Sequence, residues 1–186
     1  MEKILKDRCS KLSNINPLKN WNVSKGNLFE YMFKDCSSLT EIDSLLNWNV
    51  SKGLNFKGMF NNCSSLSNIN GLKNWNVANA TYFKEMFGQC KSLSNISGLL
   101  NWDVSKGINF EEMFRECHSL SNINALQKWN VSNVENFESM FAGCISLSKL
   151  KPLEKWNVSK GACFRSMFYN ISDYKEISKL SLKWKI

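Results

Sequence analysis

A period of 27 residues runs from residue 9 to residue 170 and constrains the fold more than any other feature. Trp, Met-Phe and Cys recur six times at this interval, with the cysteines at Cys9, Cys36, Cys63, Cys90, Cys117 and Cys144. Such a period is typical of solenoids, in which each repeat packs only on its neighbours. We therefore predict one continuous domain with an N-terminal cap at 1–8, six repeats at 9–170, and a partial seventh turn or C-terminal cap at 171–186.

The segment around Met-Phe has the apolar spacing of a short helix. Phe56, Met59, Phe60 and Cys63 stand at i, i+3, i+4 and i+7, which is one face of a helix of two to three turns. Ser51 precedes this segment, and serine is a good N-cap because its hydroxyl accepts a hydrogen bond from an orphan backbone N–H. The pattern predicts a short helix in each repeat.

The segment after each cysteine has the pattern of a short strand with polar outward positions. Residues 66–70 form this segment in one repeat, and in-register copies would build a parallel sheet with neighbours about 4.8 Å apart. Turn residues follow it, and residues 75–77 are predicted as a second extended piece. We predict an α/β repeat with one short parallel strand and one short helix per 27-residue turn.

Two motifs relate the repeat to a known family. The MF-x-x-C-x-S-L core and the W-N/D-V-S stretch resemble the BspA-like bacterial surface-protein leucine-rich repeats, and the resemblance covers residues 9–170. It implies a right-handed leucine-rich-repeat-like solenoid that serves in adhesion to host proteins or to other cells. The chain departs from the family in the Leu66 to Trp75 spacing, which is one residue longer than the commonest family form, and its residues lead us to expect none of the usual export and anchoring segments.

The first residues of the chain bear on its localisation. Residues 1–18 contain no apolar run of seven or more, so we expect no signal peptide, and no stretch of 18 apolar residues suggests a membrane span. The family resemblance implies a bacterial cell surface or extracellular site. The expectation from the residues is a cytosolic protein or a fragment of an exported one, without membrane insertion.

The cysteines are expected to be buried free thiols that pack as small hydrophobic groups. Their count of seven is odd, and six of them share an inward column whose side chains point the same way. We expect no metal and no cofactor, because the sequence has no C-x-x-C motif and His118 is its single histidine.

A catalytic site in a repeat protein should show as departures from the consensus. His118 is one departure, but its column neighbours Lys91 and Ile145 are not partners for proton transfer. Asp103, which replaces Asn in the W-N-V column, is another and is expected to reach solvent. No set of nucleophile, base and orienting group emerges, so we do not expect an enzyme.

Two variable columns are the candidate partner-binding face. If the strand prediction holds, they line a flat polar surface whose charge changes from acidic to basic along the solenoid. The alternative is a surface that is only solvated. The columns are Glu41, Asn68, Asn95, Asn122 and Lys149, and Asp43, Asn70, Ser97, Asn124 and Lys151.

The asparagines of the W-N-V motif form a further column, at Asn22, Asn49, Asn76, Asn130 and Asn157. Their expected role is structural rather than recognition: bonding to backbone in turns and to each other along the stack.

The basic residues do not predict a nucleic-acid site. The net charge is +8, and one column holds Lys25, Lys52, Lys106 and Lys160. Asn79 and Asn133 interrupt this column, and the aromatic residues lie almost entirely on core columns, whereas a phosphate-binding stripe needs an unbroken run with aromatic platforms.

These patterns favour a non-enzymatic interaction scaffold that binds a protein or a surface polymer through an exposed solenoid face, in adhesion if the resemblance holds. A purely structural spacer or excised repeat array is the alternative, and a polyanion or nucleic-acid binder is third. We expect a monomer, with end-to-end association as the other possibility.

Overall fold

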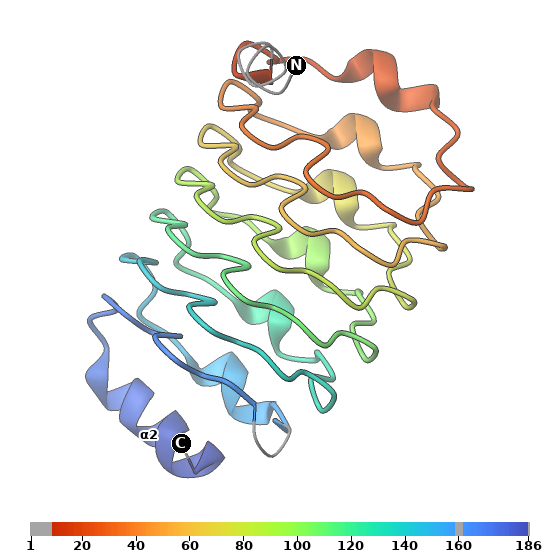
Figure 1. The fold of residues 1–186 in the computed structure, drawn as a ribbon. Coiled ribbons are helices and arrows are strands. Elements are labelled where there is room, and N and C mark those ends of the chain that lie inside the picture. The colour runs from red at the N-terminus through yellow and green to blue at the C-terminus, as the bar shows by residue number, and fades with distance from the viewer. Residues whose placement is uncertain (1–8, 159–161, 186) are drawn as a thin grey trace.

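The computed structural model describes residues 9–158 and 162–185, and its repeats stack as successive coils of one solenoid (Figure 1). Backbone hydrogen bonds join each coil to the next at a constant offset, as from Phe29 N to Asn55 O and from Phe56 N to Tyr82 O, both 2.9 Å. We number the repeats 1 to 6 from residues 9–35 to residues 144–170. The predicted cap at 1–8 lies outside the described residues.

A short 3-10 helix follows the predicted strand position in every repeat, and these helices stack in one column (Figure 1). They are η1 (Asn16–Asn20), η2 (Asp43–Leu45), η3 (Asn70–Leu72), η4 (Ser97–Leu99), η5 (Asn124–Leu126) and η6 (Lys151–Lys155). Consecutive turns come very close here, since a Cβ on Gly71 would lie 2.0 Å from the carbonyl oxygen of Ile42.

The predicted helix at residues 56–63 is wrong. The segment forms two consecutive four-residue turns, closed by hydrogen bonds from Met59 N to Phe56 O (3.2 Å) and from Cys63 N to Phe60 O (3.1 Å). The first and last residues of each turn face the core, which reproduces the spacing of a helical face. The third residue of each turn has a positive φ, 58° at Gly58 and 61° at Asn62.

This left-handed conformation recurs at the same two positions in all six repeats. Glycine occupies only Gly58 and Gly143, and the other residues are Tyr31, Asp35, Asn62, Glu85, Gln89, Glu112, Glu116, Ser139, Ser166 and Asn170. For a non-glycine residue this conformation costs about 1–2 kcal/mol of free energy. In return its N–H can reach the next coil, as from Gly58 N to Lys84 O and from Asn62 N to Gly88 O, both 2.8 Å.

The predicted Ser cap is also wrong, since Ser51 caps no helix. Its N–H and hydroxyl both donate to Asn49 Oδ1, at 3.1 and 2.7 Å.

The strand prediction is right that neighbouring repeats pair in parallel and in register. It is wrong about which segment pairs most regularly. The described residues contain no continuous strand, and the segment at 66–70 makes one isolated parallel bridge, from Asn68 to Asn95. We call the two consecutive four-residue turns of each repeat the paired turns. The longer series of bridges lies just before them, at Leu28, Asn55, Tyr82, Asn109, Asn136 and Cys163.

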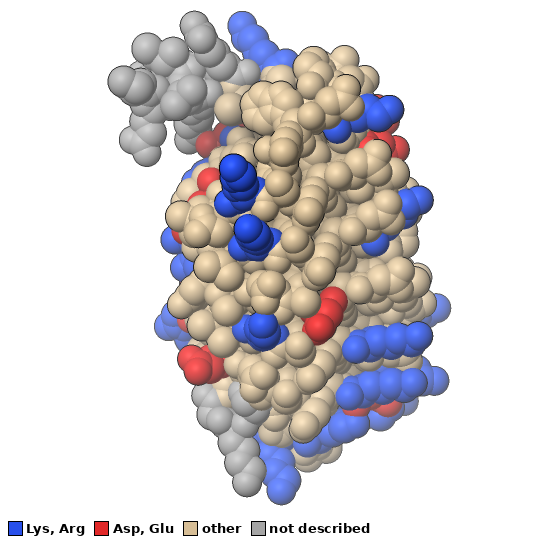
Figure 2. All heavy atoms as spheres, turned by 90° about the vertical axis from the view of Figure 1, so that its right-hand side faces the viewer, with Lys and Arg blue, Asp and Glu red and all other residues tan. Residues whose placement is uncertain are grey.

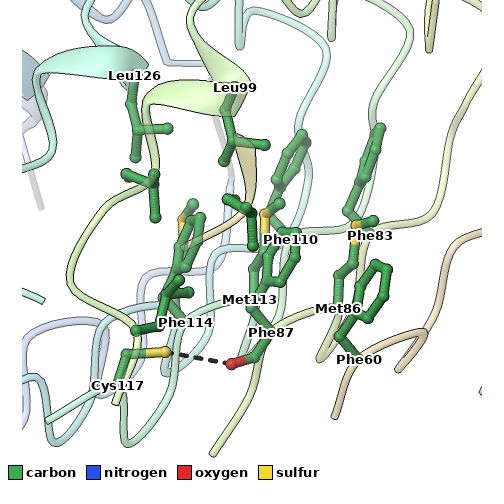
Figure 3. Packing of buried hydrophobic residues seen from close by; sticks show 14 of the residues in the cluster. Phe60, Phe83, Met86, Phe87, Leu99, Phe110, Met113, Phe114, Cys117 and Leu126 are labelled. Atoms are coloured by element: carbon green, nitrogen blue, oxygen red, sulfur yellow. Dashed lines mark hydrogen bonds between the residues drawn. The ribbon is translucent and has the colours of Figure 1, made fainter. Parts of the chain in front are cut away.

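The core is a set of columns in which each side chain stacks on its own copy (Figure 3). Trp48 and Trp75 have ring centroids 6.4 Å apart with planes 2° apart, and Phe60 and Phe87 lie 5.7 Å apart with planes 1° apart. Five indole N–H groups donate to a leucine carbonyl of the preceding coil, as from Trp75 Nε1 to Leu45 O at 2.9 Å; they belong to Trp48, Trp75, Trp102, Trp129 and Trp156.

The prediction of buried free thiols is confirmed for Cys36, Cys63, Cys90, Cys117 and Cys144. Four of them donate to a phenylalanine carbonyl of the preceding coil, and Cys117 Sγ lies 3.2 Å from Phe87 O (Figure 3). The thiol is therefore more than a small apolar group, because it also satisfies a backbone oxygen.

The helix α2 (Tyr174–Trp184) follows the sixth repeat and covers its lower side (Figure 1). Asp173 caps it, since its side chain accepts a 3.1 Å hydrogen bond from Glu176 N. Trp184 stacks on Trp156 with ring centroids 6.3 Å apart and so extends the tryptophan column, whereas Tyr174 is exposed. No helix in the described part of the chain is both long and apolar enough to cross a membrane.

The paired turns predict that glycine is more stabilising than alanine at the third position of a turn, whereas a helix would favour alanine over glycine. Gln89 is exposed with φ at 61°, so Gln89→Gly should unfold at higher urea than Gln89→Ala, by about 1 kcal/mol in free energy of unfolding. The matched control is exposed Ser178 within α2, where Ser178→Gly should be less stable than Ser178→Ala by about the same amount. The same order at both positions would contradict the turn.

The thiols make a second prediction. Burial raises the pKa of the Cys90 and Cys144 thiols to about 12, so the core thiols should not react with a disulfide reagent in the folded protein. Half-buried Cys9 and Cys163 should react first, and all seven should react after denaturation. Titration of free thiols with and without denaturant checks this, and rapid labelling of the core cysteines in the native state would refute it.

Candidate partner-binding face

The two variable columns lie together on one surface beside the stacked 3-10 helices. We call this surface the amide face, and all of its residues except half-buried Asn68 are exposed. Its members are Glu41, Asp43, Asn68, Asn70, Asn95, Ser97, Asn122, Asn124, Lys149 and Lys151.

Two neighbouring hollows open on this face. The larger has a volume of about 400 Å³ between repeats 4 and 5, and the second, of about 330 Å³, lies between repeats 5 and 6. Both are lined by Asn122 and Asn124, so they adjoin one another along the solenoid. Volumes of this order are within the range of ligand sites in proteins.

The asparagines of the first column have two roles at once. Oδ1 of Asn68, Asn95 and Asn122 accepts the backbone N–H two residues later, at 3.2, 2.9 and 2.8 Å, and so fixes the start of the 3-10 helix. Among the described residues, no acceptor binds the Nδ2 group of these three amides. The face therefore presents amide donors at intervals of one coil on a rigid backbone.

Charge changes along the amide face in the predicted direction. Glu41 and Asp43 lie at its N-terminal end, Lys149 and Lys151 at its C-terminal end, and the part between them is uncharged. The central hollow is thus a neutral hydrogen-bonding surface, and its lining includes one exposed apolar residue, Leu100.

The asparagines of the W-N-V column are structural, as predicted. Oδ1 of Asn22, Asn49, Asn76 and Asn130 accepts the N–H two residues later at 3.1 to 3.2 Å. The predicted bonding of these amides to each other is not found in the described parts of the chain. Asp103 takes the same role, accepting from Ser105 N at 3.0 Å, and it is exposed as expected.

The basic column is interrupted in the sequence by Asn79 and Asn133. Lys25, Lys52 and Lys106 are exposed. Asn79 accepts from Lys106 Nζ at 2.8 Å and itself donates to Ser51 O at 2.9 Å. Lys160 lies outside the described residues.

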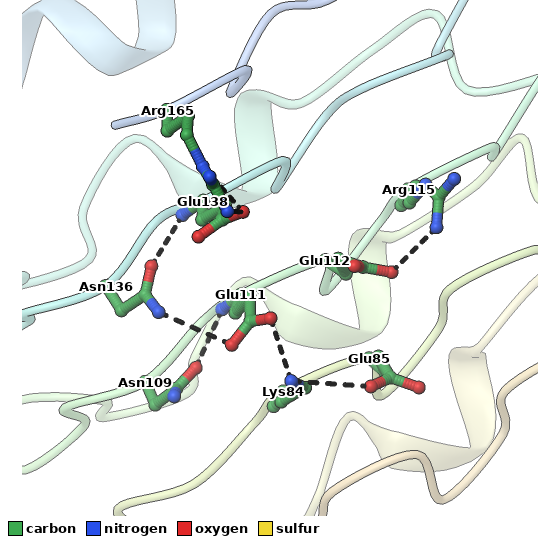
Figure 4. A network of polar contacts seen from close by, with 9 residues as sticks. All are labelled: Lys84, Glu85, Asn109, Glu111, Glu112, Arg115, Asn136, Glu138 and Arg165. Atoms are coloured by element: carbon green, nitrogen blue, oxygen red, sulfur yellow. Dashed lines mark hydrogen bonds and ion pairs between the residues drawn. The ribbon is translucent and has the colours of Figure 1, made fainter. Parts of the chain in front are cut away.

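A charged network on the paired turns was not identified from the sequence (Figure 4). Lys84 Nζ lies 2.8 Å from Glu111 Oε1, and this hydrogen bond raises the pKa of Lys84. Glu138 pairs in the same way with Arg165 of the next repeat. Opposite charges one period apart were the available signal, and because these groups satisfy one another we assign them to stabilising the stack.

His118 has a partner that column reasoning missed. Its Nε2 lies 2.7 Å from Glu116 Oε2, two residues earlier, because the turn at Glu116 reverses the chain. A histidine–carboxylate pair can serve a general base, but within the described residues no hydroxyl or thiol hydrogen-bonds to the other ring nitrogen.

The carboxylate of Asp103 should make the stability of the turn that it closes with Ser105 dependent on pH. Hydrogen bonds from the Ser105 hydroxyl and N–H, together with nearby Lys106, hold its pKa below the ordinary value of 3.8. A lowered pKa in the folded state stabilises the fold above the unfolded pKa, and this contribution is lost as pH falls through the folded pKa. Urea unfolding from about pH 5 to about pH 3 should therefore show the wild type losing stability relative to Asp103→Asn. An unchanged difference would contradict the assignment, since all other carboxylates are common to both proteins.

Comparisons with known proteins show the family of the chain. The family model described as "Mycoplasma protein of unknown function, DUF285" matches residues 1–97 and 94–186. Among solved structures, the chain is similar to a leucine-rich repeat protein from Eubacterium ventriosum ATCC 27560, with 17% identity and a TM-score of 0.41. That alignment covers 78% of this chain but only 41% of the other protein. No curated protein matches. Since the family model spans the whole sequence, the chain belongs to the DUF285 family of Mycoplasma proteins of unknown function.

Proposed function

We propose that this protein is a non-enzymatic scaffold that binds a protein or surface polymer along the amide face. The observation that supports this most directly is the row of Nδ2 donors at Asn68, Asn95 and Asn122, held in register by their own Oδ1 bonds. Exposed donors on a rigid framework bind without the entropic cost of ordering loops.

The geometry favours an extended partner rather than a small molecule. The hollows follow one another from coil to coil, and donors that recur at each coil match a chain whose acceptors recur at a similar interval. Peptide carbonyls and sugar hydroxyls both have this character. The neutral centre between an acidic and a basic end would also set the direction in which a charged partner lies.

The resemblance to BspA-like repeats supports adhesion to host proteins or other cells as the biological setting. The alternative, a spacer without a ligand, predicts that the amide face has no binding role. The described contacts of His118 favour the scaffold over an enzyme, because the His118–Glu116 pair has no third group to act upon.

The test uses a substitution that keeps the fold and removes the donor. In Asn95→Asp with Asn122→Asp, a carboxylate oxygen can still accept the backbone N–H while both Nδ2 groups are lost. Binding to purified extracellular matrix proteins and bacterial surface polymers should weaken about tenfold or more, as expected for two hydrogen bonds of roughly 1 kcal/mol each. Surface-immobilised binding measurements and thermal melts of the same samples provide the readouts.

The matched control is the same exchange in the structural column, Asn22→Asp with Asn130→Asp. Asp103 already occupies this column naturally, so the control should bind and melt like the wild type. An equal loss of affinity in both variants would assign the effect to net charge. If no tested polymer or protein binds the wild type, the spacer is the better account.

A further inference from the structure

The positive charge of the protein is concentrated at one end. Residues 145–186 contain nine basic and three acidic residues, and so supply six of the eight net positive charges. Lysine and arginine side chains gather at the lower right of Figure 2, toward the C-terminal end of the solenoid. These lysines follow no single column, and only Lys149 and Lys151 belong to the columns singled out by the repeat pattern.

The patch forms where α2 packs beside η6. We call it the basic end, and every one of its residues is exposed. Its members are Lys149, Lys151, Lys155, Lys175, Lys179, Lys183 and Lys185.

The carboxylate of Glu154 lies among several lysines of the basic end and cannot neutralise them all. Glu154 pairs with Lys179, and its backbone oxygen accepts from Lys183 Nζ. The hydrogen bond from Lys179, with added attraction from Lys151 and Lys183, lowers the pKa of Glu154. Several lysines of the basic end therefore have no carboxylate of their own among the described residues, and their charge is available to a partner.

The outer side of α2 also exposes large apolar groups among these charges. Leu182 is 82% exposed and Tyr174 is 77% exposed, the two highest values among the large hydrophobic residues described. Leu182 stands three residues after Lys179 and seven after Lys175, so the three side chains share one side of the helix. The opposite side of α2 packs on the solenoid, since Leu180 and Trp184 are buried against the sixth repeat.

We infer that the basic end docks on the surface of a negatively charged lipid bilayer. The lysines complement anionic headgroups, and Leu182 with Tyr174 reaches the apolar boundary beneath them without any segment spanning the membrane. A soluble polyanion satisfies the charges equally well but gives an exposed leucine nothing to enter, so the apolar residues favour the bilayer. This surface is distinct from the neutral centre of the amide face.

Co-sedimentation with vesicles tests this inference on the whole chain. The protein should bind vesicles of phosphatidylcholine mixed with phosphatidylglycerol and should not bind phosphatidylcholine alone, and added salt should release it. The variant Lys155→Gln, Lys175→Gln, Lys185→Gln removes three lysines that form no ion pair among the described residues. It should lose roughly 100-fold in affinity, because each lysine near an anionic surface contributes about fivefold.

Two controls make the result specific. Lys25→Gln, Lys52→Gln, Lys106→Gln makes the same change in net charge on the basic column and should bind like the wild type. Leu182→Ser should weaken vesicle binding, whereas Leu100→Ser, at a leucine 49% exposed on the amide face, should not.

Three results would overturn the inference. Equal losses in the two lysine variants would show attraction by net charge alone. An absence of binding to the anionic vesicles would exclude the bilayer as the partner. Binding to heparin or DNA instead of the vesicles, with an affinity that Leu182→Ser leaves unchanged, would exclude it too.

Discussion

The fold depends on hydrogen bonds between coils that start from backbone in the left-handed conformation. In repeats 1 to 5 two residues adopt a positive φ, and their N–H groups donate to the next coil rather than to a neighbour in the same segment. A single repeat would bear this conformational cost with no coil to accept the bonds. Local conformation and stacking are therefore inseparable, which is the physical reason that solenoids are stable only as arrays.

Polar groups inside the stack are satisfied by the same translation. Tryptophan N–H and cysteine S–H groups donate to backbone oxygens of the preceding coil, as from Trp102 Nε1 to Leu72 O at 3.1 Å and from Cys144 Sγ to Phe114 O at 3.0 Å. A buried donor without an acceptor costs free energy, so these two residue types fit their columns only because the preceding coil is present. Trp184 shows the limit of the rule: α2 places its ring on the column, but its buried Nε1 has no acceptor in the described structure.

Asparagine links this framework to the proposed binding face. In both asparagine columns Oδ1 closes a turn, and the column beside the 3-10 helices also borders the hollows of about 400 and 330 Å³. One amide can thus define the backbone with its oxygen and offer its nitrogen to a partner. The basic end differs in kind, because it arises where α2 departs from the repeat and brings lysines from two elements together.

The sequence alone determined the solenoid, its inward columns and the exposed polar columns, because a position that repeats every 27 residues keeps the same side of the coil. The membership of the amide face followed directly from that rule. The backbone of the Phe56 to Cys63 segment did not, since two four-residue turns and a helix place apolar residues at the same spacing, and only hydrogen bonds to the next coil distinguish them. The His118–Glu116 pair and the basic end were likewise decided by the tertiary structure. The first depends on a reversal of the chain at Glu116, and the second on how a helix outside the repeat register packs against the last coil.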